Sequence, residues 1–320
     1  MPVTLNEAKK NVQDALQIGV IDEFRKSSFL LNNLTFDDVV SPTGGGATLT
    51  YGYTRLVTQP TAAFRAVNSE YTAQEVTKLR YTADLKVFGG AFEVDRIIAG
   101  MGGIINEVTL QMAQKVKAAQ ALFNDTVING DSAVNANAFD GLEKALTGSS
   151  TEMIPTAAID LSTSAAIDTN YKLFLDVLDE FLMGLDGTPS AIMGNTKLIA
   201  KIRAVARRSA MYNTSMDEFG QQVEKYGNTP LVDLGSKAGS NDPVVPIGVD
   251  TSAGLTSLYA VRLGLDGFHG ISMAGQPPVR TWLPDFTTAG AVKKGEVEMV
   301  AAVALKATKA AAVLRKIKVA

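Results

Sequence analysis

Cysteine is absent from the sequence, and histidine occurs only once among its 320 residues. The chain therefore offers no disulfide bond and no thiolate metal site. Histidine is the commonest general acid or base and a frequent metal ligand. Sites that need two imidazoles are excluded, and a Ser-His-Asp arrangement would have to use His269. Enzymes that work through carboxylates alone remain open, and no cofactor is indicated.

Long apolar runs and an excess of positive charge are also missing. No apolar stretch approaches the roughly 20 residues that span a bilayer, so no membrane partner is expected. The first residues, Met1 to Glu7, lack a basic segment followed by an apolar one, which predicts no signal peptide. The formal net charge of −3 gives no overall basic field for tight nucleic-acid binding. A hydrophobic content of 46% indicates an ordinary folded protein.

The most informative feature is a long two-armed segment between glycine clusters at residues 44–46 and 89–90. Apolar and polar residues alternate in each arm, with the apolar positions at Ala47, Leu49, Tyr51 and Tyr53 in the first and at Leu79, Tyr81, Ala83, Leu85 and Val87 in the second. A period of two predicts half-exposed antiparallel strands, and about ten residues per arm would reach roughly 30 Å. A two-stranded ribbon is marginal alone, so we expect it to lie on a neighbouring subunit.

Charged residues of both signs are interleaved along this segment. The candidate intersubunit contacts are Arg55, Arg65, Glu70, Glu75, Lys78 and Arg80. Mixed charges suit pairing with another copy of the same protein. A solvated hairpin is the alternative interpretation.

A long amphipathic helix is predicted after the second glycine cluster. Its packing face consists of positions separated by three or four residues: Ile105, Val108, Met112, Val116, Ala119 and Phe123. Asn129-Gly130 predicts a left-handed end to the helix. About 25 residues at 1.5 Å each give nearly 40 Å, which indicates an elongated subunit.

Shorter signals organise the rest of the chain. Thr4 and Glu7 form a capping-box pattern for a helix that we expect to pack on a neighbour. Residues 36–40 read as a short strand, 155–285 as an α/β region with a buried strand near residues 190–194, and 297–305 and 313–319 as closing strands. Asn195 can cap a helix that ends in Arg207 and Arg208.

Several motifs have a chemical and a structural interpretation. Residues 100–103 resemble part of a dinucleotide loop, but Ile105 stands where the third glycine belongs, so a tight turn is predicted. His269 near Asp266 is interpreted as a polar turn residue, and Asp37-Asp38 as a solvated strand edge.

Two basic groups remain open between binding and structure. The first group consists of Lys201, Arg203, Arg207 and Arg208. It could bind phosphate, form a solvated helix face or form a salt-bridge surface between subunits. Weak contact with nucleic acid, or a soluble edge strand, would suit Lys306, Lys309, Arg315, Lys316 and Lys318.

The order of these elements, with Asn129-Gly130-Asp131 and Phe139-Asp140-Gly141-Leu142 after the long helix, resembles the major capsid proteins of tailed bacteriophages. The resemblance covers nearly the whole chain and implies an α+β fold of the Hong Kong 97 type. It implies an N-arm at 1–33, an entry strand at 34–43, an E-loop at 44–90, a P-domain at 91–154 with its spine helix at 104–129, an A-domain at 155–285 and closing P-domain strands at 286–320.

The resemblance also implies a function. The chain would be a non-enzymatic structural protein that assembles into hexamers and pentamers and forms an icosahedral head around double-stranded DNA. Implied partners are copies of itself, a separate scaffolding protein, a portal and a cement protein, and DNA through weak contacts. The expected location is the virion capsid after synthesis in the bacterial cytoplasm. The alternatives are an encapsulin-type bacterial cargo shell and an α/β enzyme that uses carboxylates.

Overall fold

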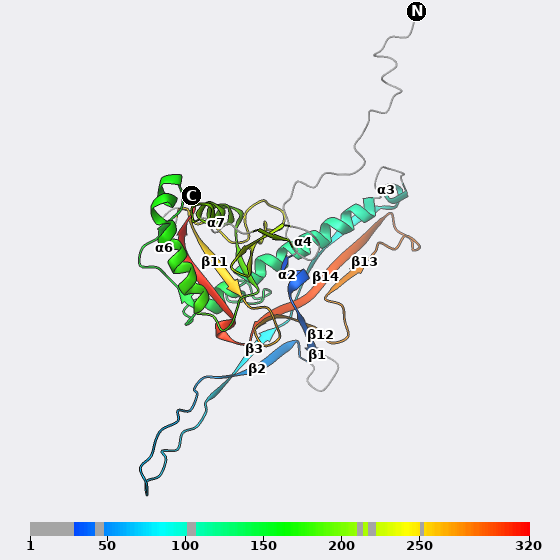
Figure 1. The fold of residues 1–320 in the computed structure, drawn as a ribbon. Coiled ribbons are helices and arrows are strands. Elements are labelled where there is room, and N and C mark those ends of the chain that lie inside the picture. The colour runs from blue at the N-terminus through cyan, green and yellow to red at the C-terminus, as the bar shows by residue number, and fades with distance from the viewer. Residues whose placement is uncertain (1–28, 42–47, 101–106, 210–213, 217–221, 250–252) are drawn as a thin grey trace, which may run out of the picture.

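A computed structural model describes residues 29–41, 48–100, 107–209, 214–216, 222–249 and 253–320 of the chain. A body of two sheets and several helices lies in the middle, and a thin ribbon projects from it (Figure 1). The predicted helix of the N-arm, the residues 101–103 and Ile105 lie outside the described residues.

The first sheet is built around the longest strand, β14 (Val292–Leu305). Its order is β1 (Phe36–Val40), β12 (Phe268–Met273), β14 and β13 (Val279–Trp282), and β4 (Lys86–Asp95) pairs with β14 along its other edge. β1 runs parallel to β12, and the other pairs are antiparallel. The long helix α4 (Glu107–Asn129) packs against β4 and β14 and runs along the sheet (Figure 1).

The second sheet forms the α/β part of the molecule. Its order is β5 (Glu152–Met153), β15 (Ala311–Lys318), β11 (Leu255–Val261), β7 (Ala191–Gly194), β10 (Thr229–Asp233), β9 (Gln222–Tyr226) and β8 (Thr214–Met216), with β6 (Ile159–Asp160) on β15. Helices α6 (Ser164–Met183) and α7 (Thr196–Arg208) accompany it. The buried apolar faces of α6, α7, β7, β11 and β15 form one core cluster.

Two predicted domain boundaries differ from this topology. β12 and β13 lie in the range assigned to the A-domain, yet both pair with β14 of the first sheet. β15 was assigned to the closing P-domain strands, yet it pairs with β11 and lies inside the second sheet. Strand pairing over such sequence distances is set by the tertiary fold, which local periodicity does not report.

The predicted end of the ribbon at residues 89–90 lies inside β4. These glycines do not form a turn: a Cβ on Gly89 would lie 2.0 Å from the Val297 carbonyl oxygen on β14. The glycine is needed for close approach of two strands. β4 then ends at Asp95, and the short helix α3 (Arg96–Gly100) follows. The Asp95 Oδ1 accepts a hydrogen bond from the Ile97 amide at 2.8 Å and thereby caps the start of α3.

Helix α4 ends at Asn129, as predicted, but not through a left-handed glycine. Gly130 lacks a positive φ, and a Cβ there would lie 2.2 Å from the Phe139 carbonyl oxygen. The Gly141 amide donates to the Gly130 carbonyl at 2.8 Å, so the loop after the helix folds back onto the helix end. The short helix α5 (Leu142–Leu146) follows.

An aromatic group joins the first sheet to α4. The Phe123 ring lies 5.9–6.2 Å from the rings of Phe36, Phe88 and Phe139. Leu30, on the short helix α2 (Phe29–Asn33), is fully buried in the same core cluster. The described end of the N-arm thus packs on its own subunit, and the helix that we expect to pack on a neighbour lies outside the described residues.

Local predictions in the second sheet are confirmed. β7 is buried along its whole length, and the Asn195 side chain caps α7 by accepting from the Leu198 amide at 2.9 Å. The helix ends at Arg208, and the predicted closing strands are present as β14 in the first sheet and β15 in the second.

Candidate interaction surface

The ribbon consists of β2 (Thr50–Leu56), β3 (Lys78–Asp84) and the residues 57–77 between them. We call β2 and β3 the ribbon base, and 57–77 the ribbon tip. The two strands pair antiparallel with Tyr53 opposite Tyr81, and Figure 1 shows the ribbon leaving the body. Each arm has seven paired residues, fewer than the ten expected, because the chain from Lys86 onward joins the first sheet.

One face of the ribbon base packs on its own subunit. The Tyr53 hydroxyl donates to the Leu305 carbonyl at 3.0 Å, and the Tyr51 hydroxyl donates to Asp37 Oδ2 at 2.8 Å. Burial raises the pKa of both tyrosines, so the phenols stay protonated and keep donating. The expectation that the ribbon has nothing of its own to lie on is therefore wrong for its base.

Arg55 is an anchor of the ribbon base. Its Nε donates to the Lys306 carbonyl at 2.8 Å, its Nη2 donates to the Leu305 carbonyl, and its guanidinium carbon lies 4.3 Å from the centre of the Tyr81 ring. These groups belong to the same chain. Arg55, a candidate for contact with a neighbour, is thus used within the subunit.

Polar contacts between its two limbs hold the ribbon tip, and the hydrogen bonds of the described residues include none from the tip to the body. The hydroxyls of Thr58 and Thr77 lie 2.7 Å apart, and Gln74 Oε1 accepts from the Thr61 amide at 2.7 Å. Every residue from 56 to 80 is exposed. Phe64 is fully exposed, and Val67 is 88% exposed. Large apolar side chains gathered on one exposed segment mark an interaction site.

The remaining charged candidates lie on this exposed part. Arg65 donates to the Ser69 carbonyl at 3.1 Å and stacks over Tyr71 at 5.3 Å. Glu70, Glu75 and Lys78 are exposed, and none of them forms an ion pair with another residue in the described ranges. The Arg80 guanidinium covers Gly52 on β2, where a Cβ would approach its Nη2 to 3.0 Å.

The predicted packing face of the long helix faces the first sheet most closely at its C-terminal end. Ala119 and Phe123 are buried, whereas Val108, Met112 and Val116 are half-buried. The helix thus becomes more exposed toward α3, away from the ribbon (Figure 1).

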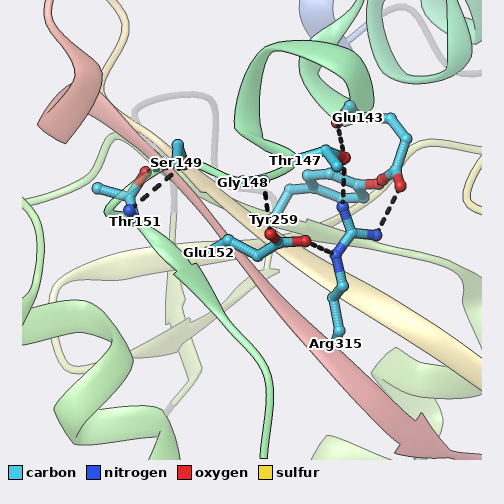
Figure 2. Close-up of polar contacts among 8 residues, drawn as sticks. All are labelled: Glu143, Thr147, Gly148, Ser149, Thr151, Glu152, Tyr259 and Arg315. Carbon is cyan, nitrogen blue, oxygen red and sulfur yellow. Dashed lines mark hydrogen bonds and ion pairs between the residues drawn. The ribbon is translucent and has the colours of Figure 1, made fainter.

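Sequence reasoning missed a charged network that joins α5 to the second sheet (Figure 2). Arg315 on β15 donates from Nη1 to Glu143 at 2.6 Å and from Nε to Glu152, and the Tyr259 hydroxyl donates to the other Glu143 oxygen at 2.5 Å. Burial, which raises the pKa of Glu152, is outweighed by the Gly148 amide and Arg315, which hold that pKa below its usual value. Arg315 was noticed in the sequence as a basic residue, but its partners could not be predicted because the two carboxylates come from segments more than 160 residues away.

The two basic groups that the sequence left open lie mainly in contacts within the subunit. Arg203 pairs with Glu224 at 2.6 Å, and Arg208 pairs with Asp168. Lys306 lies 3.5 Å from Asp37, and Lys318 lies 3.7 Å from Asp160. β15 is an internal strand, so an edge-strand role for its basic residues is wrong.

Three further sequence interpretations can be compared with the structure. Within the described residues, no group of three or more His, Asp or Glu side chains could hold a metal ion, and no helix is long and apolar enough to cross a membrane. His269 lies buried in β12, not in a polar turn as predicted. Asp37 is 15% exposed and hydrogen-bonded to Tyr51, which corrects its interpretation as a solvated edge.

The sequence matches no family model and no curated protein. Solved structures do match. The holo-SrpI encapsulin complex from Synechococcus elongatus PCC 7942 aligns with a TM-score of 0.68 and 16% identity over 100% of this chain and 97% of that chain. The capsid of the native GTA particle aligns with a TM-score of 0.61 and 12% identity, covering 97% of both chains. The capsid of Myoviridae phage XM1 aligns with a TM-score of 0.60 and 10% identity, covering 99% of both chains.

These alignments extend from one end of the chain to the other and include both sheets and the ribbon. At identities of 10–16%, these alignments show that the fold is shared and do not by themselves show a shared function. The chain therefore has the α+β fold of Hong Kong 97-type capsid proteins that the element order predicted.

Proposed function

We propose that this protein is the subunit of a closed shell, and specifically the major capsid protein of a tailed bacteriophage. The observation that carries the proposal is the ribbon tip, which exposes Phe64, Val67 and Tyr71 to solvent while the ribbon base is fixed to the body. Burying a large apolar side chain contributes about 1.5–3 kcal/mol. A neighbouring copy that covers the tip supplies that burial without refolding the subunit.

The arrangement suits a repeated interface. A heterologous contact, in which one surface meets a different surface of the next copy, forms a ring when the rotation closes. Hexamers and pentamers of this subunit would close a shell around double-stranded DNA. We expect a scaffolding protein, a portal and a cement protein as further partners, and the virion capsid as the location after synthesis in the host cytoplasm.

A bacterial cargo shell is the second candidate. It is favoured by the TM-score of 0.68 to the encapsulin complex, against 0.60–0.61 for the two capsids. The two functions share the ribbon contact and differ in what the shell holds.

No catalytic role is included in the proposal. An enzyme that uses carboxylates would need unengaged acid groups in a cleft, whereas Glu143 and Glu152 are both engaged by Arg315. This charged network therefore gives no support to an α/β enzyme.

Electron microscopy of the purified protein tests the proposal. We expect closed shells, formed by the protein alone or after co-expression with proteins encoded beside it. Nuclease-resistant DNA in shells isolated from infected cells supports the phage capsid, and an enclosed enzyme found by mass spectrometry supports the cargo shell. A protein that remains monomeric in all these preparations contradicts both.

A further inference from the structure

The single histidine of the chain lies where the ribbon base meets the body. His269 is 0% exposed, and neither ring nitrogen has a hydrogen-bond partner among the described residues. The Tyr51 ring of β2 packs edge-on against the imidazole, with 5.8 Å between ring centres. Buried polar atoms usually have partners, so this unpaired imidazole calls for an explanation.

Three titratable groups from three different segments face this histidine. Asp37 of β1 places Oδ2 at 3.9 Å from His269 Nε2. The same oxygen accepts from the Tyr51 hydroxyl at 2.8 Å and lies 3.5 Å from the Lys306 Nζ. Lys306 also lies over the Tyr51 ring at 5.4 Å. One carboxylate oxygen thus holds the ribbon through Tyr51 and is the nearest acceptor for a protonated imidazole.

The neutral imidazole is the form that this environment stabilises. Burial and the nearby Lys306 charge lower the pKa of His269 below its usual value, and Asp37 and the backbone of Gly267 oppose them only in part. Protonation would place a second cation near Lys306 while the imidazole itself remains fully buried. Besides the backbone of Gly267, which favours the protonated form, an imidazolium there gains an anionic partner by taking Asp37 from Tyr51.

We propose that His269 makes the attachment of the ribbon base acid-sensitive, because its protonation competes with Tyr51 for Asp37 and releases β2 from β1 and β12. In the released state the imidazole is solvated and titrates near its usual value of about 6.5. The released state therefore binds more protons than the attached state below that pH. The equilibrium shifts toward release by up to about tenfold for each pH unit below about 6.5, and does not change above it.

Two measurements on the full chain test this proposal. Because there is one histidine, protein labelled with ¹³C-histidine gives a single imidazole signal, which we expect to titrate below pH 6.5. Hydrogen exchange followed by mass spectrometry, corrected for intrinsic rates, reports protection of residues 50–56 and 78–84 between pH 7.5 and 4.5. We expect their protection to fall with pH by up to tenfold per unit, relative to β11 and β15 in the same sample.

Two variants separate this effect from general acid unfolding. His269→Gln keeps a neutral polar side chain and removes the titration, so the selective loss of protection should disappear. Lys306→Met removes the cation that opposes protonation, so the loss of protection at low pH should become smaller. This variant serves as the test if His269→Gln fails to fold. Equal loss in β11 and β15, an unchanged loss in the variants, or an imidazole that titrates at or above 6.5 overturns the proposal.

Discussion

At the scale of single residues, glycines hold the end of α4 against the loop that follows. Gly130 and Gly141 are in contact through a backbone hydrogen bond, and a Cβ on Gly141 would lie 2.6 Å from the Thr126 carbonyl oxygen. Real Cβ atoms do not approach backbone oxygens so closely, and neither atom can move without shifting the helix end.

Gly130→Ala should therefore destabilise the subunit. We expect a loss of about 1–3 kcal/mol in the free energy of unfolding, the usual cost of overpacking, because the new methyl group meets the Phe139 carbonyl at 2.2 Å. Urea unfolding followed by circular dichroism measures it. Gly100→Ala is the matched control, since among the described residues no atom beyond its chain neighbours and its own helix backbone lies within 4 Å of its Cβ position. Equal stability of the two variants would show that the loop adjusts freely.

The sequence revealed local features and missed distant ones, and particular residues show why. The Asn195 cap and the buried strand before it involve residues that are neighbours in the chain, so spacing alone predicts them. Asp37 and His269 are separated by more than 200 positions, and only the parallel pairing of β1 with β12 brings them together. The candidate contacts on the ribbon were chosen by charge, so Arg55 could not be distinguished from Arg65 without knowing which face packs on β14.

At the scale of elements, the network around Arg315 connects α5, β5, β11 and β15. Tyr259 and Val313 of the second sheet belong to the same core cluster as Leu142 and Leu146 of α5, and Arg315 lies two residues after Val313 on the same face of β15. A single guanidinium thus links α5 to the second sheet, and its charge is shared by two carboxylates.

Arg315→Met should weaken this connection in a pH-dependent way. We expect the free energy of unfolding to fall by about 1–3 kcal/mol at pH 7. This is less than for a fully buried ion pair because Glu143 is partly exposed. The pKa of Glu152 is lowered in the folded state. The stability that ionised Glu152 contributes is complete at pH values above its unfolded-state pKa of about 4.3, and it is lost as the pH falls through its folded-state pKa.

The free energy of unfolding, measured in urea from pH 7 to pH 3, tests this expectation. The difference between wild type and Arg315→Met should shrink as the pH falls below about 4.3. Arg207→Met, at an exposed position on α7, is the control and should stay within about 0.5 kcal/mol of wild type. A difference that stays constant with pH would show that Arg315 acts through packing alone.

At the scale of the whole molecule, the ribbon tip and the body have different tasks. Neither core cluster contains a residue of the ribbon tip, so we expect the subunit to fold without contributions from residues 57–77. The tip contributes exposed apolar area and interleaved charge, and its described contacts, such as that of Arg65 with Tyr71, are made within the ribbon. Assembly and folding should therefore respond separately to changes in the tip.

Phe64→Asp should abolish or strongly weaken assembly while the subunit stays folded. Removing a buried phenyl group from a contact costs about 1.5–3 kcal/mol, which lowers the affinity of each contact by roughly ten- to more than a hundredfold. Because a closed shell repeats the contact in every subunit, the losses accumulate. Light scattering and electron microscopy measure assembly, and urea unfolding measures stability. Val134→Asp, at an exposed apolar position outside the ribbon, is the control. The prediction is contradicted if Phe64→Asp loses folded protein to the same extent as it loses assembly. It is also contradicted if the variant forms shells at the same concentration as the wild type.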